Sequence, residues 1–183
     1  LILDNLMAEG KMKPMVVVMP NGSIEVPGGD MMGEVPLFAK DMITSIIPFI
    51  EDNYRVYTDQ ANRAMAGLSM GGGQSWSIGL KHPEVFANIG IFSSGMFGGV
   101  TYKPFDLTAE LPELLADPQA FNDNLDVFYI SCGETDPRIT HTKAAVEAMR
   151  ENGAEIHFTA FPGGHEWQPW RKSLHELVQM LFK

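Results

Sequence analysis

Five short apolar runs, each followed by small or turn-forming residues, alternate with helical patterns along this chain of 183 residues. They lie at residues 15–19, 64–66, 89–93, 127–131 and 156–161. Runs of this length are typical of strands, and strands that alternate with helices form a parallel sheet with helices packed on it. The sequence therefore predicts an α/β fold.

The run at residues 15–19, Met-Val-Val-Val-Met, carries a strong strand prediction. It is apolar at every position and Pro20 closes it, so we expect a strand that is buried on both faces. Before it, residues 2–8 and Gly10 predict a helix that ends at a glycine. After it, three glycines and two prolines within residues 23–36 predict a loop. A helix with a kink or a restart at Pro48 should follow.

Composition excludes several classes of function. A chain with 45% hydrophobic and 20% charged residues is typical of one globular domain, and we expect residues 1–183 to form a single domain. The net charge of −10, without a basic cluster, argues against nucleic acid and anionic membranes as partners. No apolar run reaches the ~20 residues of a membrane span. Cys132 is the only cysteine, which excludes an internal disulfide and a cysteine-rich metal site.

A serine motif follows the second apolar run. Gly67-Leu68-Ser69-Met70-Gly71 fits G-x-S-x-G, in which a nucleophilic serine sits on a sharp turn between a strand and a helix. Small residues at 67 and 71 would let the strand and the helix close on that turn. The helix that begins here directs free N–H groups toward Ser69, and the N–H of Met70 is the natural first donor to an oxyanion. The alternative is a glycine-rich turn with an incidental serine.

A serine nucleophile needs a base and a group that orients the base. His165 follows the last predicted strand and comes directly after Pro162-Gly163-Gly164, where glycines give the backbone the freedom to orient the histidine side chain. That position is at the same sheet edge as Ser69, where open α/β sheets hold their sites. His141 is the second candidate. The remaining histidines fit structural positions, namely His82, His157 and His175.

The orienting acid is expected where residues 127–131 lead into the next loop. Asp136 leaves that strand at the same edge and would accept a hydrogen bond from Nδ1 of His165. Glu134 is an alternative, and so is an Asp-Pro turn without a catalytic role. No second histidine follows His165-Glu166 at metalloprotease spacing, and Gly71-Gly72-Gly73 lacks the ending of a phosphate-binding loop. The sequence therefore predicts neither a metal nor a cofactor.

Two further predictions concern substrate recognition. Residues 95–124 form a long connection with three prolines, which we interpret as a cap insertion beside the site; a disordered surface insertion is the alternative. Trp167, Met31, Met32 and Phe97 lie in segments that leave the active edge and could offer apolar surface to an acyl group. Trp167 could instead only pack beneath the histidine loop.

Several segments together resemble the esterase-D-like α/β-hydrolases, and most closely the feruloyl esterase and acetylxylan esterase branch of bacterial carbohydrate esterases. These segments are residues 41–56, 62–73, 82–86, 132–136 and 163–167, so that the resemblance extends over nearly the whole chain. The order Ser, Asp, His is also that of α/β-hydrolases.

The resemblance implies a triad of Ser69, Asp136 and His165, with Met70 as an oxyanion donor. It also implies a serine esterase that releases feruloyl or acetyl groups from a plant cell-wall polysaccharide such as xylan. S-formylglutathione hydrolases and enterochelin esterases share the scaffold, so the fold alone does not choose the substrate. A non-catalytic carbohydrate-binding remnant is the competing class.

The family pattern includes an upstream strand, ending in His-Gly, that supplies a second oxyanion donor. The sequence does not match that segment, so the chain resembles the carboxyl-terminal two thirds of a catalytic domain that lacks the N-terminal strands. We expect an upstream segment, or a strand from another copy in a homo-oligomer, to complete the sheet. The alternative is that residues 15–19 pair directly with the strand before Ser69. We also expect a secreted or periplasmic protein whose targeting segment lies upstream of Leu1.

Overall fold

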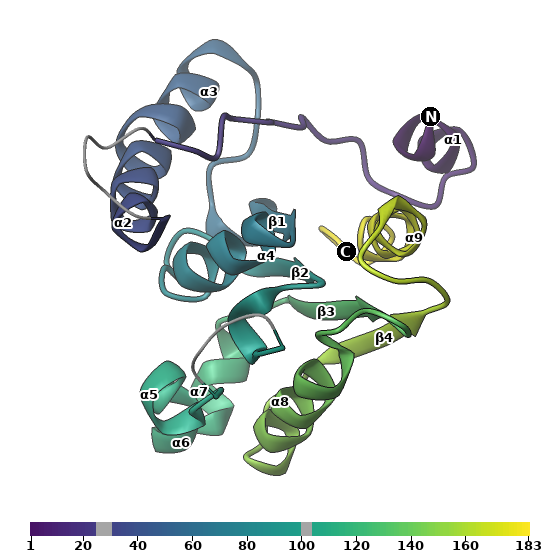
Figure 1. The fold of residues 1–183 in the computed structure, drawn as a ribbon. Coiled ribbons are helices and arrows are strands. Elements are labelled where there is room, and N and C mark those ends of the chain that lie inside the picture. The colour runs from purple at the N-terminus through teal and green to yellow at the C-terminus, as the bar shows by residue number, and fades with distance from the viewer. Residues whose placement is uncertain (25–30, 100–103) are drawn as a thin grey trace. The chain divides into compact units, whose positions relative to one another are not determined.

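The computed structural model describes residues 1–24, 31–99 and 104–183 (Figure 1). These form two compact units, one from residues 1–13 and 60–183 and the other from residues 14–59. The larger unit contains the sheet and all three residues predicted to form a triad.

A parallel sheet of four strands, in the order β1-β2-β3-β4, is the centre of the larger unit. Its strands are β1 (Ala64–Leu68), β2 (Asn88–Phe92), β3 (Val127–Gly133) and β4 (His157–Phe161). Every residue of β2 and β3 is buried, as two-sided burial of a central parallel strand requires. The predicted α/β fold with a mostly parallel sheet is confirmed.

One face of the sheet is covered by α9 (Trp167–Leu177), which packs on β2, β3 and β4 (Figure 1). Helix α1 (Ile2–Ala8) packs against α9 and ends before Gly10, whose φ of +66° is the left-handed conformation of a glycine stop. The helix at residues 2–8, with its glycine stop, is as the sequence predicted.

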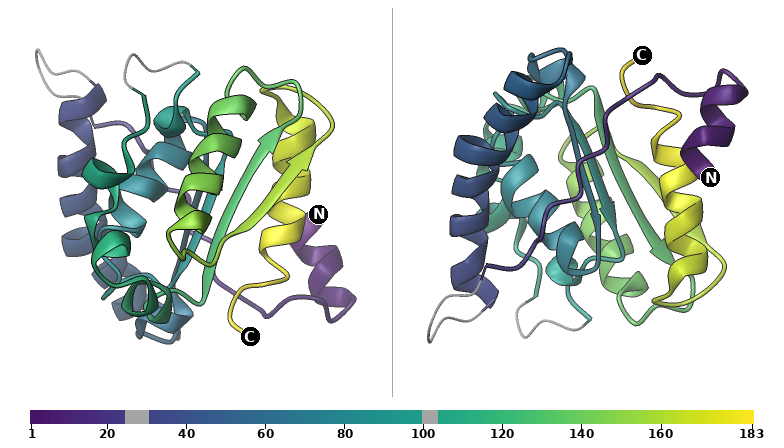
Figure 2. Two further views of the ribbon diagram at one scale, coloured as in Figure 1. Left: turned by 90° about the horizontal axis from the view of Figure 1, so that it is seen from below. Right: turned by 90° about the horizontal axis from the view of Figure 1, so that it is seen from above.

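The opposite face is covered by α8 (Ile139–Glu151) and by α4 (Met70–Gln74), which continues as η3 (Ser75–Gly79) (Figure 2). Helix α4 contacts β1 and β2 directly, while α8 contacts β3. Because β1 leads straight into α4, the carboxyl end of that strand and the start of the helix meet at Ser69.

The connection at residues 95–124 contains four short helices in its described part. These are η4 (Gly95–Phe97), α5 (Leu107–Glu110), α6 (Pro112–Ala116) and α7 (Pro118–Asp123). Side chains of Asp106 and Asp117 cap α5 and α7 by accepting hydrogen bonds from backbone N–H groups. The segment is thus structured where it is described; its role as a cap over the site stays a prediction.

The smaller unit, residues 14–59, is helical from Met31 to Asn53. Helix α2 (Met31–Asp41) runs through a π-helical turn, η1 (Met42–Ile46), into α3 (Ile47–Asn53). The backbone stays helical through Ile46 and Ile47, and the irregularity expected near Pro48 takes the form of the π-helical turn that precedes α3, which begins at Ile47 with proline in its first turn. The predicted loop at 23–36 is wrong from Met31 onward, since Pro36 lies inside α2; residues 25–30 lie outside the described part.

Residues 15–19 do not form the predicted buried strand. They have no regular secondary structure, and the exposed fractions of Val16, Val17, Val18 and Met19 are 49%, 50%, 43% and 88%. A strand requires a neighbour that accepts and donates backbone hydrogen bonds, and no described residue supplies one for this run. Direct pairing with the strand before Ser69 is also wrong, because β1 pairs with β2 alone in the described chain.

Candidate active site

Ser69 occupies the turn between β1 and α4. Its φ of +54° and ψ of −113° are uncommon for a residue with a side chain, and such a conformation costs on the order of 1–3 kcal/mol. The N–H of Ser69 donates to the carbonyl of Phe92 at the end of β2, at 2.8 Å, which fixes the turn to the neighbouring strand. The strained turn presents the Ser69 hydroxyl beyond the end of the sheet.

The glycines on either side of Ser69 have different roles. A Cβ atom on Gly67 would overlap the backbone of Gly71, so only glycine fits at position 67. A Cβ on Gly71 would meet nothing within 4 Å. The expectation that both positions must be small is therefore confirmed for Gly67 and wrong for Gly71, whose backbone, rather than its missing side chain, makes the close approach.

Two loops meet beyond the ends of β3 and β4. A Cβ on Gly133, the last residue of β3, would overlap the carbonyl oxygen of Gly164. Gly163 has a φ of +121°, and its carbonyl accepts a hydrogen bond from the N–H of Thr135 at 3.0 Å. Backbone contact between glycines thus holds the loop of His165 against the loop of Asp136.

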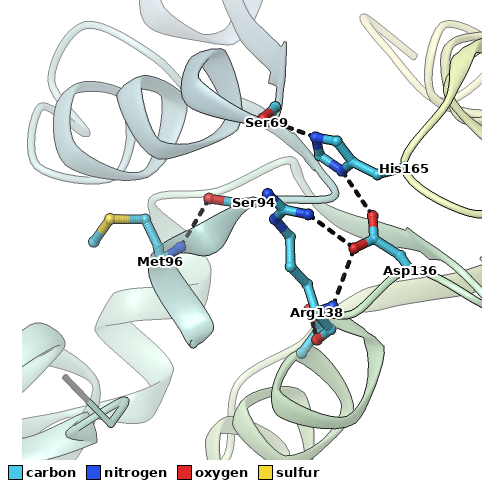
Figure 3. A network of polar contacts seen from close by, with 7 residues as sticks. Ser69, Ser94, Met96, Asp136, Arg138 and His165 are labelled. Carbon is cyan, nitrogen blue, oxygen red and sulfur yellow. Dashed lines mark hydrogen bonds and ion pairs between the residues drawn. The ribbon is translucent and has the colours of Figure 1, made fainter. Parts of the chain in front are cut away.

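The structure brings Ser69, His165 and Asp136 together in one hydrogen-bonded series (Figure 3). Nε2 of His165 lies 3.0 Å from Oγ of Ser69, and Nδ1 lies 2.8 Å from Oδ2 of Asp136. The hydroxyl donates to Nε2 and the Nδ1–H donates to the carboxylate in the tautomer that such a series requires. This is the geometry of a nucleophile, a base and an orienting acid.

Asp136 is 1% exposed and carries an ion pair that sequence reasoning missed. Burial alone would raise the pKa of this carboxyl, but hydrogen bonds from the N–H of Arg138, from His165 and from the Arg138 guanidinium hold the pKa below its usual value. Both Arg138 groups lie 3.0 Å from Oδ1. The carboxylate therefore stays ionised. The sequence feature that could have predicted this ion pair is Asp-Pro-Arg, which places an arginine two residues after the acid.

The alternative site residues lie elsewhere. His141 is exposed on α8 and its Nδ1 is 2.9 Å from the position that a Cβ on Gly98 would occupy. Glu134 is exposed, and its N–H donates to the carbonyl of Phe161. His82 bonds Glu84 at 3.0 Å and His175 contacts Gln179 at 3.2 Å. The series of hydrogen bonds at Ser69 includes none of these residues.

Met70 is the first residue of α4, so its N–H has no acceptor within the helix. That position beside Ser69 fits an oxyanion donor, a role that stays a prediction. Among residues 1–24, 31–99 and 104–183, no group of three or more His, Cys, Asp or Glu side chains is arranged to hold a metal ion. Within the same ranges, no helix has the length and apolar character needed to cross a bilayer.

The predicted substrate-binding residues have three different outcomes. Trp167 is 66% exposed, and its ring lies 5.4 Å from that of Trp170, so it presents open aromatic surface close to the histidine loop. Phe97 is 1% exposed and packs 5.2 Å from Trp76, so it is a core residue and its assignment to an acyl pocket is wrong. The side chains of Met31 and Met32 lie outside the described part of the chain.

Comparisons with known proteins agree with this geometry. The family model Esterase, described as "Putative esterase", matches residues 2–181. An endo-1,4-beta-xylanase/feruloyl esterase of Xylanibacter ruminicola is 34% identical over 186 residues, which cover 100% of this chain and 23% of that protein. The chain thus spans less than a quarter of the length of this curated relative.

Two solved structures resemble the chain over 97% of its length. One is a ferulic acid esterase that is 25% identical with a TM-score of 0.72, and the match covers 74% of that chain. The other is a CE1 ferulic acid esterase from Anaeromyces mucronatus in complex with ferulic acid, 24% identical with a TM-score of 0.80 over 69% of that chain. The second likeness concerns the fold alone.

Proposed function

The chain belongs to the Esterase family, and from this premise we propose that it is a serine carboxylic-ester hydrolase. The observation that carries the proposal is the hydrogen-bonded series of Ser69, His165 and Asp136, with distances of 3.0 and 2.8 Å. A non-catalytic carbohydrate-binding protein would have no need of a buried carboxylate that orients a histidine toward a serine.

In the proposed acylation, Nε2 of His165 takes the proton of Ser69 as Oγ attacks the ester carbonyl carbon. The oxyanion that forms accepts a hydrogen bond from the N–H of Met70 at the start of α4. When the carbon–oxygen bond to the alcohol breaks, the imidazolium gives its proton to the leaving oxygen. Asp136 stays ionised and stabilises the imidazolium throughout.

As substrates we propose feruloyl or acetyl esters of a plant cell-wall polysaccharide such as xylan. The support is the similarity to an endo-1,4-beta-xylanase/feruloyl esterase at 34% identity, together with the exposed ring of Trp167 near the histidine loop. An aromatic surface of this kind suits a hydroxycinnamoyl ring. Trp167 is accordingly proposed to bind the acyl group.

The test is hydrolysis of methyl ferulate and of 4-nitrophenyl acetate by the wild type and by Ser69→Ala. We expect turnover of both esters by the wild type and none above background by the variant. Turnover that survives in Ser69→Ala would overturn the proposal, and so would an inactive wild type. Preferential cleavage of S-formylglutathione or of a catecholate siderophore lactone would keep the esterase chemistry and replace the substrate.

Trp167→Ala tests the acyl-binding role. We expect a loss on methyl ferulate on the order of 10-fold and little change on 4-nitrophenyl acetate, because the ring of ferulate belongs to the acyl group, whereas the ring of 4-nitrophenyl acetate belongs to the leaving group. Equal losses on both substrates would show that Trp167 serves the structure of the loop instead.

Two other parts of the proposal concern the context of the chain. We propose a secreted or periplasmic location, because a polysaccharide substrate is found outside the cytoplasm; fractionation of the source cells would test it. We also propose that a further strand, from a longer chain or a second copy, pairs with β1 and carries a second oxyanion donor, since β1 pairs only with β2 among the described residues. Light scattering of this chain and a structure of the longer protein would decide between the two sources.

A further inference from the structure

Trp170 packs its ring directly against the imidazole of His165. The ring centroids are 4.8 Å apart and the planes are nearly perpendicular, at 86°, which is a favoured arrangement of aromatic pairs. The structure places Trp170 in the first turn of α9, in contact with the residue that accepts the serine proton.

The indole of Trp170 is held by ring contacts and not by its polar atom. Its Nε1 is buried and finds no hydrogen-bond partner among the described residues, although a buried tryptophan N–H usually has one. The ring of Trp167 also packs against it, with centroids 5.4 Å apart and planes at 81°. Trp170 therefore contacts both the exposed ring of Trp167 and the imidazole of His165.

The helix that carries Trp170 is fixed to the sheet by buried hydroxyl groups and a carboxylate. Oγ of Ser131 in β3 donates to Oγ of Ser173, which donates to the carbonyl of Pro169. Glu176 accepts hydrogen bonds from the hydroxyl of Tyr129 at 3.0 Å and from that of Thr159 at 3.1 Å. Burial and the neighbouring Glu176 raise the pKa of Tyr129, which keeps it a donor. Trp170 thus stands on a helix with a fixed position.

The contact matters most when His165 has lost one of its two hydrogen bonds. In the free enzyme the ring is held at Nε2 by Ser69 and at Nδ1 by Asp136. In the acyl-enzyme Oγ of Ser69 is esterified and carries no proton to donate. The bond to Asp136 then remains, and a single hydrogen bond at one edge leaves a planar ring free to tilt.

We propose that Trp170 is a positioning residue that holds the imidazole of His165 in place through the acyl-enzyme stage and thereby speeds deacylation. This inference rests on the proposed esterase function. In deacylation Nε2 takes a proton from water while the water oxygen bonds to the acyl carbon. The bond from that carbon to Oγ of Ser69 then breaks, and Nε2 returns the proton to Oγ, which frees the acid and restores the serine.

The kinetic test compares Trp170→Leu, Trp170→Phe and a control, Leu174→Ala, with 4-nitrophenyl acetate in rapid-mixing experiments. Leu174 lies one turn further along α9 and is half-buried, so its truncation perturbs the helix without touching the imidazole. In Trp170→Leu we expect the acylation burst to persist while the steady-state rate falls on the order of 10- to 100-fold. Since deacylation then limits turnover, kcat and KM should fall together and kcat/KM should change little.

The other variants separate positioning from general stability. Trp170→Phe keeps a ring against His165 and loses no hydrogen bond of the described chain, so its steady-state rate should stay close to that of the wild type. Leu174→Ala should lower the melting temperature and leave both kinetic phases intact. An equal loss of the burst and the steady state in Trp170→Leu, or a Phe variant as slow as the Leu variant, would overturn the inference.

A second measurement does not depend on turnover. Ser69→Ala removes the hydrogen bond at Nε2 of His165, as acylation does. In this variant the proton NMR signal of the His165 Nδ1–H reports how firmly the imidazole is held toward Asp136. We expect a sharp downfield signal in Ser69→Ala and its loss through exchange with water in the double variant Ser69→Ala/Trp170→Leu. The same signal in both proteins would refute the positioning role. Because no ester is used, failure here is distinct from a failure of the proposed function.

Discussion

Two largely apolar runs of the chain, β3 and residues 15–19, have opposite structures. Val-Phe-Tyr-Ile-Ser-Cys-Gly in β3 is buried at every residue between β2 and β4. Met-Val-Val-Val-Met at 15–19 has no strand partner in the described chain, and its valines are about half exposed. A largely apolar run indicates that a segment should be buried on both faces. Such a run forms a buried strand only when neighbouring strands on both sides satisfy its backbone hydrogen bonds.

The two units of the chain also differ in whether they contribute residues to the candidate active site. Ser69, Asp136 and His165 all follow strands of the sheet in the larger unit, whereas the smaller unit of residues 14–59 contributes none of them. Substitutions at these three residues should therefore affect catalysis far more than substitutions in the smaller unit.

The largest effect is expected at Ser69. Ser69→Ala should lower kcat on 4-nitrophenyl acetate by on the order of 10⁵-fold, because members of a serine triad act as a unit. The matched control in the smaller unit is Ser45→Ala, an exposed serine of η1 whose loss should leave kcat unchanged. Comparable losses in both variants would break the division between the two regions.

The next effect is expected at Asp136. Asp136→Asn should reduce kcat about 10³- to 10⁴-fold, because the amide favours the wrong tautomer of His165. The melting temperature measured beside kcat would show whether the variant is folded. Near-normal turnover would move the orienting role to Glu134, which the structure leaves exposed.

A single kind of substitution in each apolar run compares their packing directly. Val127→Ala in β3, where the side chain is 5% exposed, should lower the free energy of unfolding by roughly 2 kcal/mol through lost burial and a cavity. Val17→Ala, where the exposed fraction is 50%, should change it by about 0.5 kcal/mol or less. Chemical denaturation measures both. Equal losses would indicate that residues 15–19 are covered in solution by a strand that the described chain lacks.

The smallest effect is an acid-dependent loss of stability that belongs to Asp136. Burial disfavours its ionised form, but its hydrogen bonds hold the pKa below the ordinary value of 3.8. The unfolded state therefore binds the proton first as pH falls. The stabilising contribution is present above about pH 3.8 and is lost as pH falls through the lowered pKa of the folded state. Unfolding free energies of wild type and Asp136→Asn should differ in slope in that acid range; parallel slopes would contradict the prediction.

The sequence predicted what local pattern and strand order determine. Four strands, the turn at Ser69 and the convergence of His165 with Asp136 follow from apolar runs whose carboxyl ends share one sheet edge. The sequence did not predict what depends on distant partners. Residues 15–19 were assigned from their own composition and Phe97 from its place in a segment at the active edge. The outcome for residues 15–19 depends on a strand neighbour, and that for Phe97 on packing against the rings of Trp76 and Phe105. Arg138 and Trp170 were missed because a contact with a site residue leaves little local pattern.

The contact between Ser69 and His165 joins residues that are 96 positions apart, and this separation has a consequence for synthesis. A ribosome completes the nucleophile long before it adds the base, and α9, which docks on β3 through Ser131 and Tyr129, is made later still. A nascent or truncated chain that ends before residue 165 carries a serine without a base to activate it. Ester cleavage by this mechanism therefore waits until α9 has emerged and docked, so hydrolytic activity can report, during expression, that synthesis has passed this helix.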